Sequence, residues 1–463
     1  MKCRQILAGM AVVAMLAAAP ASAQSLADSL IAAYRNSNLL EQNRAVLRAA
    51  DEDVAIAVAS LRPTLDFVTE ASTSIASRQG VGIMARGGPS QSLSVGLQAQ
   101  LTLIDFGRGQ LAREAAKASV LATRHALTGL EQDVLQGAIN AHLDVRIATE
   151  AVSLQRATVR AISEELEAAR QRFELNEVTR TDVALAEASL AAARSALAAA
   201  EGELTAAREG YKFATGQEAG QLRPPPALPS TAASLDAAKD IARRTHPDIL
   251  QAQQQVTIGE LNAQRIGAQR HGSVTAGANL GAEVSSGSEP TRSASANIRY
   301  ARPIFQGGRL NAETRQANAQ RDEARAGLHQ SVARVLQNVA IAWANIDVAQ
   351  ARTAASRQQV SAAESAFEGT REEARLGVRT TLDVLNAETD LLEARTNLLE
   401  AEASVQTATY SLLSAMGLLT VDHLGLGVPT YDAEAYFDAV RDAPVTSSQG
   451  EALDRVLRAL NRD

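Results

Sequence analysis

The chain has 463 residues, a formal net charge of −7, 3% aromatic residues and one cysteine. The mild charge is spread along the chain and argues against nucleic acid as a partner. The one cysteine, Cys3, excludes disulfides and thiolate metal sites. Few aromatics and abundant alanine disfavour one large globular core and favour an elongated protein of packed helices.

The N-terminal segment has the features of a secretory signal peptide. Lys2 and Arg4 precede an apolar run at 6–19, and small residues at 21–23 form a cleavage site. We therefore expect residues 1–23 to be removed and the mature protein to be exported without a lipid-modified cysteine. No later stretch approaches the roughly 18 apolar residues of a membrane-spanning helix, so we expect no helix to cross a bilayer.

The first half of the mature chain changes from helical periodicity to strict alternation and back again. The predicted elements are a helix at 26–61, strands at 65–75 and 93–103 around a glycine-rich loop, a helix at 109–175 and a helix at 183–214. The helix at 109–175 contains no proline and would be on the order of 100 Å long. Its turn at 176–181 reverses the chain into the last helix, which ends at the C-cap glycine Gly216.

The helix at 183–214 carries a seven-residue repeat. Large apolar residues recur seven apart, and alanine follows each of them by three (Val183, Leu190, Leu197, Leu204 and Tyr211; Ala186, Ala193, Ala200, Ala207 and Ala214). This seam is sustained over five heptads and predicts a coiled coil in which alanine lets the helix backbones approach closely.

The same plan returns in the second half of the chain. The seam recurs 201 residues later, again with alanine three positions after each residue (Val384, Leu391, Leu398, Val405 and Leu412). Helices are predicted at 235–270, at 310–376 and from 384 towards Gly417, with strands at 274–284 and 294–300. The chain is therefore predicted to be mainly α with β, and internally duplicated. Its segments are a signal peptide (1–23), a first repeat (24–220), a proline-rich linker (221–233), a second repeat (234–418) and a C-terminal extension (419–463).

The four strands are typical of a membrane barrel. Each has about eleven residues, with one apolar and one polar face, as suits lipid outside and water inside. Four strands cannot close, and open edges are not stable in lipid, so we expect several copies to contribute to one barrel. Three copies would give twelve strands. The long helices would continue the same cylinder into the periplasm. The alternative is a soluble periplasmic sheet beside a coiled coil, which the weak aromatic girdle favours and the symmetry of the copies disfavours.

From residue 26 to about 424, the sequence resembles the TolC family of outer-membrane efflux channels. The resemblance is carried by Leu61-Arg62-Pro63, by the segments 245–250 and 303–309, and most specifically by the helical turns at 172–183 and 375–387. It implies a homotrimer with an outer-membrane β-barrel and a periplasmic α-helical tunnel. Such a trimer is a passive exit duct that docks onto a periplasmic adaptor and an inner-membrane ABC or proton-driven pump.

The resemblance also implies a periplasmic constriction. Arg379 falls on the arginine of the family's gate, with Thr181 and Asp182 on its partners in the neighbouring hairpin, and Asp383 on a ring aspartate. Three copies of Asp383 around a narrow hole would favour cations. The second ring position is Asn386 instead of a carboxylate, which halves the charge, and the gate tyrosine is replaced by Ala374.

The same turns resemble those that the family's adaptors grip. The contact residues implied are Leu175, Asn176 and Val178 in the first turn, with Leu376, Gly377 and Val378 in the second. The extension at 419–463 looks like that of type I protein-secretion members, which favours protein export over drug efflux as the function.

Other classes of protein fit the sequence less well. The six histidines show no ligand spacing, and there is no nucleophile elbow or phosphate-binding glycine loop, so we expect neither an enzyme nor a cofactor or metal. A periplasmic adaptor would have one hairpin and an inner-membrane anchor, whereas this chain has two hairpins and no anchor. A structural coiled-coil rod would not need four alternating strands.

Overall fold

The computed structural model describes residues 24–75, 78–80, 83–85, 89–286 and 289–443. These residues form two compact units. Unit 1 contains residues 24–42, 127–247 and 332–430, and unit 2 contains residues 43–126, 248–331 and 431–443. The predicted signal peptide and the end of the C-terminal extension, residues 444–463, lie outside the described residues.

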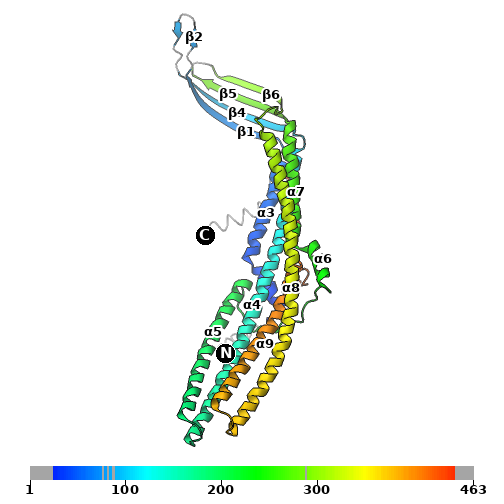
Figure 1. Cartoon of the computed structure of the whole chain (residues 1–463). Coiled ribbons are helices and arrows are strands. Elements are labelled where there is room, and N and C mark those ends of the chain that lie inside the picture. Colours follow the sequence, from blue (N-terminus) through cyan, green and yellow to red (C-terminus); the bar gives the residue numbers. More distant parts are fainter. Residues whose placement is uncertain (1–23, 76–77, 81–82, 86–88, 287–288, 444–463) are drawn as a thin grey trace, which may run out of the picture. The chain divides into compact units, whose positions relative to one another are not determined.

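The helices repeat with the predicted offset (Figure 1). They are α2 (Leu26–Asn36), α3 (Asn38–Ala59), α4 (Arg108–Glu174), α5 (Arg180–Thr215), α6 (Leu235–Thr245), α7 (Pro247–Ala268), α8 (Arg309–Arg375), α9 (Thr381–Ala415) and α10 (Ala433–Val440), with a 3-10 turn η1 (Gln269–His271). Helices α4 and α8 are both 67 residues long. Their equal length at an offset of 201 confirms the internal duplication.

Two helices predicted as continuous are each broken once. Residues 26–61 divide at Ser37, whose backbone is extended and whose Oγ accepts a hydrogen bond from the Leu40 amide at 3.2 Å. Residues 235–270 divide at His246, because Pro247 begins α7 and excludes helical backbone in the residue before it. The prediction of two continuous helices was therefore wrong. A side-chain cap interrupts the first, and a proline interrupts the second.

The predicted heptad seam is the packed face of unit 1. Every seam residue of α5 and α9 is buried or half-buried, and Ala186, Ala394 and Ala401 are wholly inaccessible. Ile162 and Leu166 of α4 pack against Leu190 of α5 in the same cluster, which also includes Leu385 of α9. The small side chains of the seam bring these helices close together, as the sequence predicted.

Helix α5 is more apolar than the sequence analysis predicted. Among the described residues, α5 alone is long and apolar enough to cross a membrane by length and composition, whereas no such stretch was predicted. Alanine accounts for this, since it fills both the buried seam and much of the exposed side of α5. The exposed side has its own seven-residue stripe (Leu185, Ala192, Ala199, Ala206 and Phe213).

Unit 2 contains a four-stranded antiparallel sheet in the order β1-β4-β5-β6 (Figure 1). The strands are β1 (Thr64–Ile75), β4 (Pro89–Ile104), β5 (Ser273–Ser285) and β6 (Thr291–Ala301). The central pairing, β4 with β5, joins the two repeats and aligns Gln98 with Asn279. A small hairpin, β2 (Arg78–Gly80) with β3 (Ile83–Ala85), lies between the first two predicted strands, where a glycine-rich loop was predicted.

Among the described residues, none forms a layer that covers the apolar face of the sheet. Leu65 and Phe67 of β1 and Ile298 of β6 are 69%, 72% and 75% exposed, although they lie on the face predicted to be apolar. A soluble half-buried sheet would hide this face against a core. Strands β1 and β6 also each have one unpaired edge.

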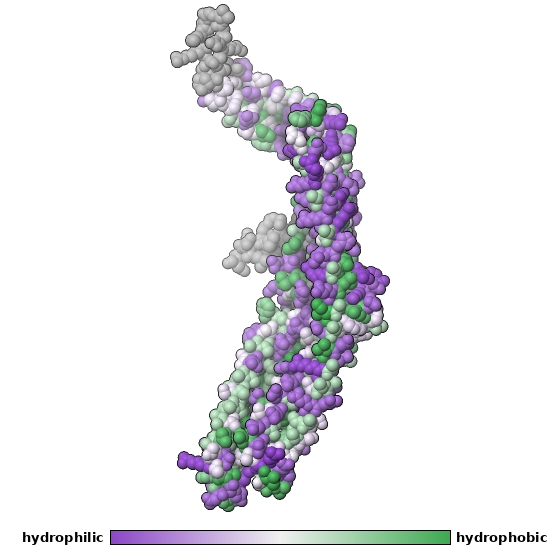
Figure 2. Space-filling view, in the orientation of Figure 1, coloured by the Kyte–Doolittle hydropathy of each residue, from purple (hydrophilic) through white to green (hydrophobic). Residues whose placement is uncertain are grey.

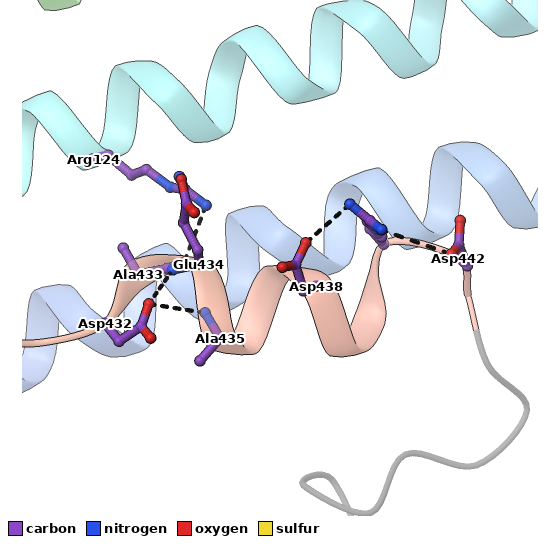
Figure 3. A network of polar contacts seen from close by, with 8 residues as sticks. Arg124, Asp432, Ala433, Glu434, Ala435, Asp438 and Asp442 are labelled. Atoms are coloured by element: carbon purple, nitrogen blue, oxygen red, sulfur yellow. Dashed lines mark hydrogen bonds and ion pairs between the residues drawn. The ribbon is translucent and has the colours of Figure 1, made fainter.

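Residues 431–443 of the C-terminal extension belong to unit 2 and pack there through α10 (Figure 3). Arg124 of α4 donates to the Ala433 carbonyl at 3.0 Å, and its guanidinium lies 5.4 Å from the centre of the Phe437 ring. The Tyr436 hydroxyl donates to Glu52 Oε1 of α3 at 2.7 Å. The sequence did not predict α10, because a helix of eight residues owes its stability to such tertiary contacts.

Candidate functional site

The turns that join α4 to α5 and α8 to α9 have the same backbone structure and lie at one end of unit 1 (Figure 1). Asn176 and Gly377 both have left-handed backbone, with φ angles of 60° and 77°. The Glu177 amide donates to the Arg172 carbonyl at 2.9 Å, and Val378 donates to Glu373 in the same way at 2.9 Å. These bonds satisfy carbonyls at the helix ends, as in a Schellman motif.

A capping box begins the helix after each turn. Thr179 Oγ1 accepts a bond from the Asp182 amide, while the Asp182 carboxylate accepts from the Thr179 amide at 2.8 Å. Thr380 and Asp383 repeat this arrangement, with the Thr380 amide 2.9 Å from Asp383 Oδ2. The bonds from Thr179 lower the pKa of Asp182, and those from Thr380 lower the pKa of Asp383. Both aspartates are therefore fixed, ionised groups at the tips.

Arg379 forms an ion pair within its own turn. Its Nε donates to Glu373 Oε2 at 2.9 Å, and both side chains are about half-exposed. The bond from Glu373, together with the Glu373 and Asp383 charges, raises the pKa of Arg379. An exposed pair contributes little to stability, so its partner can be exchanged at low cost.

The remaining predicted site residues lie on the surface near the tips. Asn386 is exposed on α9, and Thr181 is exposed at the start of α5. Among the hydrogen bonds of the described single chain, none joins Arg379 to Thr181 or Asp182. The pairing of Arg379 with Thr181 and Asp182 therefore stays a prediction for the assembled protein.

The apolar residues of the turns are presented to solvent. Leu175, Leu376 and Val378 are 70%, 73% and 73% exposed, while Val178 is partly buried. Exposed large apolar side chains on a tight turn are costly in water and are typical of a docking surface.

An acidic cavity of about 470 Å³ lies between α4, α8 and α9 in the same unit. Its lining includes five glutamates and two arginines (Glu164, Glu165, Glu364, Glu368, Glu388, Arg371 and Arg395). Arg395 pairs with Glu364 at 2.8 Å, and Arg371 lies 3.6 Å from Glu165. Burial raises the pKa of Glu388. The cavity thus offers a surplus of carboxylates to a basic partner.

Three contributors to the site were missed in the sequence. Thr179 and Thr380 were recognisable, because a threonine three residues before an acidic residue at a helix start signals a capping box. Glu373 gave no such signal, since it precedes Arg379 by six residues across a turn whose geometry only the structure shows.

The described residues contain no cluster of three or more histidine, cysteine, aspartate or glutamate side chains that could hold a metal ion. Ser29, His142 and Tyr211 do form a polar chain, in which Ser29 Oγ lies 2.8 Å from His142 Nδ1 and 2.9 Å from the Tyr211 hydroxyl. All three side chains are at most 1% exposed, so this chain ties α2 to α4 and α5 and is not open to a substrate.

A family profile and a related protein both identify outer membrane efflux proteins as relatives of this chain. The profile of the outer membrane efflux protein family matches residues 30–217 and 239–418. The outer membrane efflux protein BepC of Brucella suis biovar 1 (strain 1330) is 32% identical over 456 residues, which cover 95% of this chain and 96% of BepC.

Solved structures share the fold. The outer membrane protein VceC of Vibrio cholerae aligns with a TM-score of 0.70 and 21% identity, over 85% of this chain and 96% of VceC. The MtrE outer membrane channel of Neisseria gonorrhoeae, solved in an open state, aligns with a TM-score of 0.68 and 21% identity, over 86% and 90% of the two chains.

Proposed function

Because this chain belongs to the outer membrane efflux protein family, we propose that three copies of it form the exit duct of a tripartite export system. Members of the family are passive trimeric channels, not enzymes, that work with an adaptor and an inner-membrane pump. The protein is located in the outer membrane, with its helical tunnel in the periplasm.

The observation that carries the proposal is the uncovered four-stranded sheet. Its apolar face is exposed, and β1 and β6 both have unpaired edges. In lipid these edges must be paired, which another copy achieves when its β1 pairs with β6 of the first. Three copies closed in this way give a barrel of twelve strands.

The exposed stripe of α5 supports assembly of the helices as well. Its residues from Leu185 to Phe213 recur every seven positions, and Phe213 is 94% exposed. A second heptad stripe on a helix whose first stripe is already packed indicates a second helical neighbour. We assign this neighbour to an adjacent copy, because the described chain leaves the stripe uncovered.

In the trimer we place the constriction at the hairpin tips. Arg379 would exchange Glu373 for Thr181 and Asp182 of the neighbouring hairpin, and so hold the entrance closed. Three Asp383 carboxylates would face the opening, each held ionised by its capping bonds. The exposed turns (Leu175, Asn176 and Val178; Leu376, Gly377 and Val378) and the acidic cavity would receive the adaptor.

Two classes of cargo are candidates. We favour type I protein secretion driven by an ABC transporter, supported by the C-terminal extension at 419–463 and its resemblance to that of secretion members. Small-molecule efflux is the second candidate, supported by the name of the relative BepC, an outer membrane efflux protein.

The first experiment measures oligomer mass and planar-bilayer conductance of the purified protein. A conducting trimer is expected, and a monomer that never inserts would overturn the duct. Deletion of the gene then distinguishes protein secretion from small-molecule efflux. Loss of a secreted protein from the medium without dye accumulation supports secretion, whereas dye accumulation with normal protein secretion supports efflux.

A further inference from the structure

A cavity of about 560 Å³ in unit 2 lies where the sheet ends and the long helices begin. Three arginines line it, and no aspartate or glutamate does (Arg108, Arg302 and Arg309, with Gln269, Tyr300 and Gln306). We refer to it as the arginine cavity. It shares no residue with the hairpin tips of unit 1.

The three arginines differ in how many hydrogen bonds and ion pairs they already make within the chain. Arg108 Nε donates to the Asp105 carbonyl at 3.1 Å, and Arg309 bonds to Gln306 Oε1 at 2.6 Å and to Glu313 Oε1 at 2.5 Å. Within the described part of the chain, Arg302 makes no hydrogen bond or ion pair and is exposed. Its guanidinium therefore offers all of its donors to a ligand.

The helices that start at the cavity add to its positive potential. Arg108 and Arg309 are the first residues of α4 and α8, each 67 residues long. The N-terminus of a helix carries a partial positive charge, which favours an anion. Guanidinium groups beside such ends are well suited to phosphate oxygens, which they bind in a bidentate manner.

Exposed apolar side chains surround the arginine cavity. Ile304 and Phe305 are 96% and 87% exposed, and Phe106 and Tyr300 are about half-exposed. Figure 2 shows hydrophobic and strongly hydrophilic residues next to each other where the strands of unit 2 meet its helices. Aromatic and basic side chains mix in this way at the level of lipid head groups.

The two faces of β6 indicate whether the ligand of the arginine cavity is a lipid or a solute in the channel. Ile298 and Tyr300 lie on the apolar face of β6, which ends at Ala301, and Arg302 is the first residue after the strand. Asn297 and Arg299 occupy the opposite, polar face. Tyr300 thus brings the apolar face of β6 into the lining of the arginine cavity, and in the proposed barrel this face meets lipid.

We propose that the arginine cavity binds the phosphate of a membrane phospholipid whose acyl chains lie along the apolar face of β6. The inference rests on the outer-membrane location of the protein and not on its cargo or its pump. A bound head group would fix the depth of the barrel at the periplasmic surface of the membrane.

The test is native mass spectrometry of the full-length channel in detergent, titrated with phosphatidylglycerol. An arginine at a membrane surface contributes about fivefold to the affinity for an anionic lipid. Arg302→Gln should therefore weaken lipid binding about fivefold, and Arg302→Glu should weaken it further. Arg299→Gln is the matched control, because it removes an exposed arginine from the other face of β6, and it should bind lipid as the wild type does.

Two results would overturn the proposal. One is equal lipid binding by Arg302→Gln and the wild type. The other is displacement of phosphatidylglycerol by an equal concentration of inorganic phosphate, which would assign the cavity to a free anion. The same spectra report trimer mass, so a failure of assembly is seen in the wild type and is distinguished from a failure of lipid binding.

Discussion

Asn176 and Gly377 occupy the same left-handed position in the two hairpin turns, although only one of them is a glycine. Asparagine tolerates this conformation because its short polar side chain can bond locally. The duplicated chain has therefore kept the turn geometry while its sequence diverged.

This geometry predicts the effect of substitution at Gly377. Gly377→Val forces a β-branched residue into left-handed backbone and should cost roughly 1–2 kcal/mol. Asn176→Gly should be neutral or slightly stabilising. Hydrogen exchange at the α8–α9 turn measures the effect of Gly377→Val, and exchange at the α4–α5 turn measures that of Asn176→Gly. Equal exchange in Gly377→Val and the wild type would contradict the prediction.

The Arg379–Glu373 pair predicts a change in conductance. Arg379→Ala removes the cation that we propose to hold neighbouring hairpins together, so the single-channel conductance steps should increase. Arg375→Ala is the control, since Arg375 forms a similar exposed pair with Glu372. Equal steps in the two variants would place the constriction elsewhere.

Asp383 predicts how ion selectivity depends on pH. Capping bonds lower the pKa of Asp383, so its ring charge should persist as the pH falls to 4 and be lost only below the ordinary aspartate range. Asp383→Asn should reduce the preference for cations at neutral pH. Reversal potentials in a salt gradient measure this, and a preference that disappears already near pH 6 would implicate another group.

Asp51 predicts that the stability of unit 2 falls as the pH rises. Its carboxylate is wholly buried and has no hydrogen-bond partner, and burial raises its pKa to about 6, an effect that Arg124 reduces and Glu52 increases. Because the folded state binds the proton more tightly, stability should fall as the pH rises from 4 to 6, by about 3 kcal/mol in total. Thermal unfolding of Asp51→Asn should lack this slope, whereas the exposed control Asp53→Asn should keep it.

His142 predicts acid sensitivity in unit 1. Burial lowers the pKa of His142, so the folded state disfavours the protonated ring. The stability that neutral His142 provides is present above pH 6.5 and should be lost as the pH falls below it. His142→Gln should remove this loss, and the exposed His423→Gln should not. Equal acid profiles for the two variants would show that His142 is not responsible.

Most of the fold followed from periodicity. The seam of α5 and α9 was predicted because a repeat of seven occurs twice, and the sheet because alternation holds over four strands. The break at Ser37 was missed because a side-chain cap competes locally with a helical pattern. Helix α10 depends on contacts with Arg124 and Glu52, which lie hundreds of residues away and leave no local signal.

The candidate site was predictable only in part. The aspartates and the left-handed positions of the tips are visible in the sequence, and so are the threonines that cap α5 and α9. The Glu373 partner of Arg379 depends on how a turn brings two side chains together, which no spacing rule gives.

The pairing of β4 with β5 has a consequence for biosynthesis. Gln98 and Asn279 meet only after β5 of the second repeat has been made, so a chain that ends before β5 has a β1–β4 hairpin with an open inner edge. Such an edge is a template for pairing with another nascent chain, and contacts of long sequence separation form slowly. We therefore expect the chain to be more prone to mispairing while this edge is open than after β5 has paired with it.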